Sequence, residues 1–258
     1  MIVPQVPRAL VPVVVVSVLA WGLLLVGAGQ GWLGEATGRG GEFCEAGRGG
    51  LLRQPVNTLS NLGFTVAGLA IAWRRDRTPG APAALTAYAV VVALLGPASA
   101  AMHATETALG GRLDLFSMYL LASFTTAYAV VRSGGLDEPR GAVLFGGLVL
   151  VCEAMGSLPV TVPVLMHPGN VVFAVLLLLT IGLEGRLVRR GRAEPGWGLA
   201  SVGTLLLAFA IWSQAKDGSA LCAPRSVLQG HGAWHLLDAL AAWFLARHYL
   251  ARGPRSSS

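Results

Sequence analysis

Eight long apolar segments restrict what this chain can fold into. A helix that crosses a bilayer needs about 20 mostly apolar residues, and the alternating pattern of a membrane β-barrel is absent. The sequence therefore predicts an all-α polytopic membrane protein. The segments are Leu10–Ala28, Asn57–Trp73, Ala83–His103, Leu113–Val131, Gly141–Leu158, Gly169–Leu187, Trp197–Trp212 and His231–Leu250.

The composition agrees with a membrane protein. Hydrophobic residues make up 54% of the chain and charged residues 12%, and the mean hydropathy is +0.63. Soluble domains carry about a quarter charged residues, so this chain has too little polar surface to cover a core in water. The net charge of +6 comes mostly from arginines between apolar segments. That is a topology signal, and nucleic-acid binding is not expected; the predicted partners are the bilayer and a lipid, and no protein partner is predicted.

The basic residues also predict an orientation. With a cytoplasmic N-terminus and eight alternating helices, thirteen of the 19 basic residues fall on the cytoplasmic side and six on the outer side. Because basic residues accumulate on the cytoplasmic side, we expect both termini there, with residues 251–258 as a disordered tail. The six outer residues are Arg39, Arg48, Arg53, Arg112, Lys216 and Arg225.

The first apolar segment has two interpretations. It is either a cleaved signal peptide or an uncleaved transmembrane helix. The stretch is longer than a typical signal core of about 7–15 residues, and only Arg8 precedes it. We favour the uncleaved helix, with residues 1–41 forming this helix and an outer loop.

Two of the three cysteines fall on the predicted outer side. Cys44 and Cys222 both lie in outer loops, whereas Cys152 lies inside an apolar segment as a small buried side chain. An outer compartment permits disulfides, so we predict that Cys44 and Cys222 pair. Two unpaired thiols remain the alternative from sequence alone.

Ionisable residues collect at the outer ends of the predicted helices. Ser99 and His103 are four residues apart and share a helix face. Asp114 begins the next helix after a short loop, and His231 and His235 share a face at the start of the last helix. We therefore expect these five side chains at one membrane depth, where ionisable groups are costly and usually functional.

Three histidines at one depth are typical of a catalytic zinc site, which combines three protein ligands with one open position. The His-xxx-His spacing resembles that of zinc-binding helices but lacks their glutamate. Purely structural explanations for these residues stay open. Ser99 could bond to a helix carbonyl, Asp114 could favour a helix N-terminus, and His103 could be an interfacial residue.

Further polar residues lie close to these positions. Asn57, Ser60 and Asn61 enter a helix from the outer side, after Pro55. We interpret them as capping and interhelical hydrogen-bonding residues. Asp238 lies one turn beyond His235, where it could orient a ligand imidazole or pair with a neighbouring helix.

Three segments together resemble the alkaline ceramidase family, part of a wider group of seven-helix membrane hydrolases that includes the adiponectin-receptor-like proteins. They are "CEAGRGGLLRQPVNTLSNLGF", "GPASAAMHATETALGGRLDLFSMY" and "LCAPRSVLQGHGAWHLLDAL". The resemblance extends over about residues 42–250 and implies a seven-helix domain there. The first helix would then be an N-terminal addition.

The resemblance implies a role for each matching residue. His103, His231 and His235 match the zinc ligands. Asp114 matches the aspartate that acts on the attacking water, and Ser99 the serine that helps to hold the transition state. Cys44 and Cys222 resemble the family's disulfide. From their positions, and not from the resemblance, we expect Asn57, Asn61 and Asp238 to support the ligands from behind. The implied reaction is hydrolysis of the amide bond of ceramide or another N-acyl lipid.

The chain departs from the family at its calcium site. Animal members carry an Asp-Trp-x-Glu-x-Asn segment and a later Glu. Here Glu42 and Glu45 could serve as ligands, but Gly47 stands where the Asn should be and Gln54 where the later Glu aligns. Calcium prefers six to eight oxygen ligands, so calcium regulation is doubtful. Leu115 follows Asp114 where animal members often have Glu.

Two other functions were weighed. An intramembrane serine protease would use Ser99 with one histidine, but it leaves two histidines and Asp114 without a role. A receptor-like protein would hold a metal structurally, in a closed site without an open ligand position. The zinc-dependent lipid amidase uses all five outer residues, and we prefer it.

Overall fold

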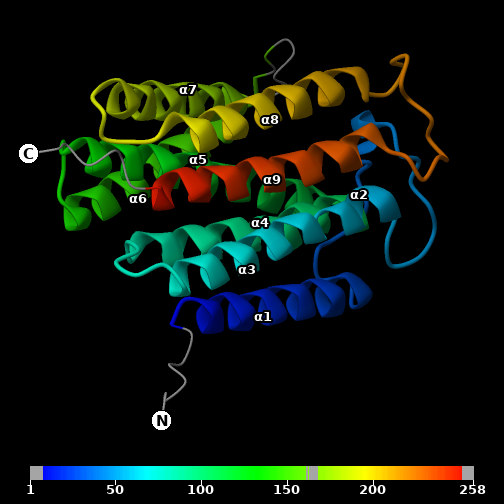
Figure 1. Ribbon diagram of the computed structural model, residues 1–258. Coiled ribbons are helices and arrows are strands. Elements are labelled where there is room, and N and C mark those ends of the chain that lie inside the picture. The colour runs from blue at the N-terminus through cyan, green and yellow to red at the C-terminus, as the bar shows by residue number, and fades with distance from the viewer. Residues whose placement is uncertain (1–7, 161, 163–167, 252–258) are drawn as a thin grey trace, which may run out of the picture.

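The chain folds into a bundle of long helices in the computed structural model, which describes residues 8–160, 162 and 168–251 (Figure 1). No β-strand occurs among these residues. A short 3-10 turn, Gly41–Phe43, lies in the loop after the first helix. The helices are α1 (Leu10–Gly29), α2 (Pro55–Ser60), α3 (Leu62–Asp76), α4 (Ala84–Thr105), α5 (Ala108–Ser133), α6 (Glu138–Gly156), α7 (Pro168–Arg189), α8 (Pro195–Gln214) and α9 (Gly230–Leu250).

The helix lengths fit a membrane protein. Helices α2 and α3 continue one another across a break at Asn61, and together they count as one of seven segments long and apolar enough to span a bilayer. Helix α9 has a similar length but does not meet that apolarity criterion in the described chain, since it carries two histidines and Asp238 near its start and Arg247 and His248 near its end. It nevertheless lies alongside α3 and α8 (Figure 1). The predicted all-α polytopic fold is confirmed.

Helix α4 is the centre of one half of the bundle. It packs against α1, α2, α3 and α5, while α5 also contacts α6 and α7, and α9 contacts α2, α3 and α8. Helix α1 packs against α3 and α4, and within the described residues it makes no extensive contact with another helix. The indole N–H of Trp21 donates to Thr65 at 2.9 Å, and the Asp76 carboxylate accepts from the backbone N–H groups of Ala9 and Leu10 at the start of α1.

Small residues let α3 and α4 approach closely. A Cβ atom added at Gly68 would lie 2.7 Å from the carbonyl oxygen of Ala89, and one added at Gly96 would lie 2.8 Å from the carbonyl oxygen of Asn61. Small residues at such contacts are typical of membrane helices, whose association depends on close packing rather than on the hydrophobic effect. This packing fixes α2 and α3 against the end of α4 that carries His103.

A buried ionic cluster lies at the end of the bundle where α1 begins and α9 ends. Glu184 on α7 contacts Arg132 on α5 at 3.1 Å and His248 on α9 at 3.0 Å. His248 also hydrogen-bonds to the carbonyl of Glu194. His248 lies at the opposite end of α9 from His231.

The loop between α1 and α2 folds back over the other end of the bundle. Its backbone bonds to the end of α4, with Arg53 N–H donating to the carbonyl of Ala104 and Gln54 N–H donating to that of His103. A disulfide joins Cys44 in this loop to Cys222 in the loop before α9, as predicted, while Cys152 is buried and free. The disulfide therefore ties the two loops together over the helix ends.

Candidate metal and catalytic site

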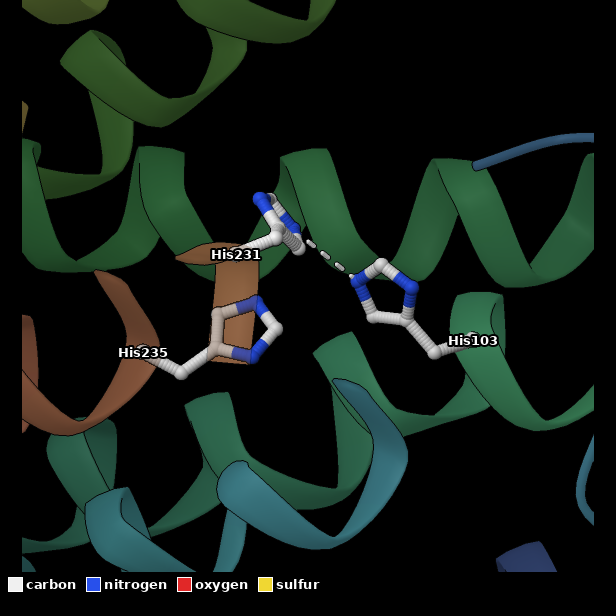
Figure 2. A group of neighbouring side chains, drawn as sticks. All are labelled: His103, His231 and His235. Atoms are coloured by element: carbon white, nitrogen blue, oxygen red, sulfur yellow. Dashed lines mark hydrogen bonds between the residues drawn. The ribbon is translucent and has the colours of Figure 1, made fainter. Parts of the chain in front are cut away.

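Three histidines meet beneath these loops. His103 lies in the last turn of α4, and His231 and His235 lie in the first two turns of α9. Their side chains point toward one another (Figure 2), and one ligand atom from each lies within 4.8 Å of the other two. The residues are 0%, 4% and 3% exposed. Among the described residues this is the one group of three or more potential His, Cys, Asp or Glu ligands.

The spacing of the nitrogens suits a tetrahedral zinc ion. Zn–N bonds are about 2.0–2.1 Å long, and two such bonds at a tetrahedral angle place the nitrogens roughly 3.3 Å apart. The Nε2 atoms of His103 and His231 are 3.2 Å apart. The buried Nδ1 atom of His231 has no hydrogen-bond partner among the described residues. Three imidazoles that converge in this way fit a zinc ion with one open position.

Gln54 holds the outward nitrogen of His103. The Nδ1 atom of His103 lies 2.6 Å from Oε1 of Gln54, which is fully buried just before α2. This contact leaves the Nε2 atom of His103 directed at His231. An imidazole whose second nitrogen is held by a neighbouring group is the usual arrangement of a metal ligand.

Ser60 holds His235 in the same way. Its hydroxyl donates to the carbonyl of Asn57 at 2.9 Å and lies 2.8 Å from the Nδ1 atom of His235. When the single hydroxyl hydrogen is directed at Asn57, the Ser60 oxygen can accept from an Nδ1–H of His235. The Nε2 atom of His235 is then free to bind a metal.

Phe43 holds His231 by stacking. The two rings are nearly parallel, with an interplanar angle of 8° and centroids 3.9 Å apart. The same phenyl ring also contacts His103 edge-on, at a centroid distance of 6.0 Å. Phe43 is buried at the end of the 3-10 turn, so the outer loop supplies an aromatic cover for two of the three imidazoles.

Ser99 and Asp114 form a second polar pair. Ser99 is buried on α4, one turn before His103 on the same face. Its side chain hydrogen-bonds to Asp114, which lies near the start of α5. The close hairpin between α4 and α5 brings the two together, as the sequence spacing predicted.

The supporting residues predicted from sequence act differently from one another. Asn57 and Asn61 are fully buried, and the side-chain amide of Asn61 donates to the carbonyl of Asn57 at 2.8 Å. This carbonyl also accepts from Ser60, and the Asn57 backbone is itself a hydrogen-bond partner of His235. The Oδ1 atom of Asp238 is buried and has no hydrogen-bond partner among the described residues.

The two acidic residues considered for calcium bond to the backbone instead. The Glu45 carboxylate accepts from the N–H groups of Val56 and Asn57 at 3.0 and 2.7 Å. The Glu42 carboxylate accepts from the N–H of Gly40 at 3.0 Å. Neither joins a group of three potential His, Cys, Asp or Glu ligands within the described chain. The expectation that calcium binding is weakened here stays a prediction.

Sequence reasoning missed the contacts of Gln54 and Phe43. Gln54 entered only as a departure from a calcium pattern, although a buried glutamine before Pro55 at a helix start is a signal that it bonds to something nearby. Ser60 was expected to cap or to join helices, and its bond to His235 was not foreseen. The sequence places His167 in the stretch "LMHPGN", which we interpret as an outer loop, and this residue lies outside the described residues.

Comparisons with known proteins give one significant result. A search of curated proteins finds no match to this chain. The model of a protein family described as Ceramidase matches residues 54–251. The match covers most of the chain, including the three histidines, Ser99 and Asp114, and the chain therefore belongs to the ceramidase family.

Proposed function

We propose that this protein is a zinc-dependent membrane amidase that hydrolyses the N-acyl amide bond of ceramide-like lipids. The family implies an amide hydrolase acting on ceramide in general. The observation that carries the zinc proposal is the convergence of His103, His231 and His235 within the bundle. Three protein ligands leave one coordination position open, which favours catalysis over a closed structural site.

The residues suit hydrolysis of an amide. His103, His231 and His235 would hold the zinc, which when bound acts as a Lewis acid that polarises a carbonyl and acidifies water. The Asp114 carboxylate would accept a proton from the attacking water as a general base. It would then deliver that proton to the departing amine as the carbon–nitrogen bond breaks, which releases a fatty acid and a sphingoid base.

The hydrogen bond between Ser99 and Asp114 suggests how the Ser99 hydroxyl becomes available as a hydrogen-bond donor to the substrate carbonyl. Before reaction the Ser99 hydroxyl donates to the carboxylate. Once Asp114 is protonated, its own O–H can donate to the Ser99 oxygen. The Ser99 hydrogen is then free to turn toward the carbonyl oxygen, where a donor stabilises developing negative charge.

We further propose that the site lies near the outer face of the membrane and that both termini are cytoplasmic. The support is the distribution of arginines, since Arg74, Arg75, Arg132, Arg189 and Arg247 lie at or near those helix ends that are remote from the histidines. Basic residues favour the cytoplasmic side. In this orientation residues 42–250 form the catalytic seven-helix unit, and α1 adds to it.

Hydrolysis of a panel of N-acyl lipids tests the proposal. The purified chain should release fatty acid from ceramides, lose this activity when zinc is chelated, and regain it when zinc is returned. Asp114→Asn should retain zinc, as measured by elemental mass spectrometry, but lose most of its activity, by about 100-fold or more. Arg112→Gln, on an exposed position of the same helix turn, is the matched control and should stay active.

Four outcomes would contradict the proposal. A folded wild-type protein without bound metal would remove the zinc centre. Full activity of His231→Ala would remove its ligand role. Unchanged activity of Asp114→Asn would exclude this carboxylate as the base. Activity on peptides instead of N-acyl lipids would point to the protease alternative.

A further inference from the structure

We propose that Gln54 is a positioning residue that couples the outer loop to the metal centre. Its acceptor oxygen sets the tautomer of His103, and its two N–H donors hold the loop that places Phe43 on His231. This inference rests on the proposed zinc function, but it concerns contacts that exist without a metal.

The orientation of the Gln54 amide follows from its three contacts. Its Nε2 atom lies 3.0 Å from the carbonyl oxygen of Gly40 and 2.9 Å from that of Glu45. An amide nitrogen has two N–H donors, and the two carbonyls use both. The Oε1 atom must therefore face His103, at 2.6 Å.

The tautomer of His103 follows from this orientation. Because an amide oxygen only accepts, the Nδ1 atom of His103 must carry the hydrogen. Its Nε2 atom then keeps a lone pair, directed at His231. In the other tautomer, the Nδ1 atom of His103 would carry no hydrogen and would face the Oε1 atom of Gln54. Gln54 is fully buried, so this would leave an unsatisfied polar group beside it. The glutamine thus prepares His103 for a metal before any metal binds.

The same amide closes a short loop around Phe43. Gly40 and Glu45 flank the 3-10 turn, and Gln54 bonds to both of their carbonyls. Gly40 and Cys44 have positive φ values of 91° and 72°, so the turn is sharply bent on either side of Phe43. Its ring stacks on His231, whose Nδ1 atom has no hydrogen-bond partner among the described residues. The stacked ring therefore orients His231 together with the 3.2 Å hydrogen bond between the Nε2 atoms of His231 and His103.

Gln54 accordingly acts on two ligands from one position, directly on His103 and through Phe43 on His231. His235 is held separately by Ser60. Loss of a group that orients a ligand typically lowers metal affinity by about 10–100-fold. We expect a loss in this range for Gln54→Leu, which removes the acceptor and both donors.

Two variants of the full-length chain separate the two actions. Gln54→Leu removes all three contacts, whereas Gln54→Glu keeps an acceptor for His103 and removes both donors to the loop. Gln229→Leu is the matched control, because Gln229 is also buried and its Nε2 atom donates to the carbonyls of Ala223 and Ser226 in another outer loop. Within the described residues, the Gln229 side chain makes no hydrogen bond to an imidazole.

Zinc affinity is measured by competition with a chelator on the purified protein in detergent. We expect the zinc Kd to rise about 10–100-fold in Gln54→Leu, less than about 10-fold in Gln54→Glu, and to stay within about 2-fold in Gln229→Leu. Hydrogen exchange of residues 40–46, followed by mass spectrometry, should accelerate in both Gln54 variants and not in the control.

Nitrogen-15 labelling of the chain's five histidines gives a readout that a general loss of stability would not produce. In the metal-free wild type the His103 signal should report a protonated Nδ1 atom. Gln54→Glu should retain this tautomer, and Gln54→Leu should give a mixture of tautomers.

The outcomes divide cleanly. Wild-type zinc affinity in Gln54→Leu would overturn the inference, and so would an equal loss in Gln229→Leu, which would show a general effect of loop damage. A protonated Nε2 atom on His103 in the metal-free wild type would also overturn it, even if Gln54→Leu fails to fold. A wild type that binds no zinc would refute the proposed function, while the tautomer and exchange measurements would still decide the role of Gln54.

Discussion

Glu45→Gln should destabilise the start of α2 and, with it, the metal centre. The Glu45 carboxylate is almost fully buried and accepts from the backbone N–H groups of Val56 and Asn57. These are among the N–H groups at a helix start that no residue of the same helix can satisfy. Ser60, which holds His235, lies in the same short helix.

The size of the effect follows from the two bonds. A hydrogen bond to a charged group contributes about 1.5–3 kcal/mol. Glutamine keeps one oxygen, as a neutral acceptor, but presents an NH₂ group to the other N–H. One charged bond is lost, the second is weakened by roughly 1 kcal/mol, and the expected loss of stability is about 2–4 kcal/mol. At roughly 2–4 °C per kcal/mol for a chain of this size, the melting temperature should fall by about 5–15 °C.

Thermal unfolding in detergent, followed by circular dichroism, measures this change. Glu35→Gln is the matched control, since Glu35 is an exposed acidic residue in the same outer loop, and its melting temperature should change by no more than about 2 °C. Zinc content should fall in Glu45→Gln at temperatures where the protein remains folded, because the helix that carries Ser60 is weakened.

An unchanged melting temperature for Glu45→Gln would refute this reasoning, because it would mean that the carboxylate does not hold α2. Calcium gives a second discrimination. If Glu45 were chiefly a calcium ligand, calcium would raise the melting temperature of the wild type and the substitution would abolish that rise. We expect no such rise when the carboxylate serves the backbone.

Three further predictions concern the same region. Ser60→Ala should lower zinc affinity about 10-fold by releasing the Nδ1 atom of His235. Ser201→Ala on α8, which removes a bond from that serine to the carbonyl of Ala241 on α9, should leave chelator-competition values unchanged. Gly68→Ala should cost about 1–3 kcal/mol in thermal unfolding because a methyl group meets the backbone of α4, while Gly146→Ala, in open space, should not destabilise the fold. Reduction of the disulfide, which spans 178 residues of sequence, should lower stability by up to about 5 kcal/mol, and an unaltered melting temperature under reductant would contradict its role.

The helices could be predicted because their cause is local. A run of about 20 apolar residues has few stable forms in a bilayer other than a helix, and each observed long helix overlaps a predicted segment. The break at Asn61 was not predicted. At this break the carbonyl oxygen of Asn61 lies close to Gly96 on α4, a residue 35 positions away.

The candidate site could be predicted only where its residues are close in sequence and lie on the same helix. Residues four apart share a helix face, so the pairing of Ser99 with His103 and of His231 with His235 followed from helix geometry. The partners of the imidazoles did not. Gln54 meets His103 across 49 residues of sequence and Ser60 meets His235 across 175, and such contacts depend on how separate helices pack.

The short helix α2 is what joins the two halves of the metal centre. Helices α4 and α9 carry the three histidines but contact each other little, whereas α2 packs against both. Gln54, immediately before α2, reaches the ligand on α4, and Ser60, at its end, reaches a ligand on α9. A rigid separation between these two residues therefore sets the distance between the ligand helices. Asn61 keeps helical backbone angles, with φ −66° and ψ −16°, so α2 continues into α3 and is held in place by it. The polar "QPVNTLSN" stretch therefore belongs to the metal centre as much as the histidines do.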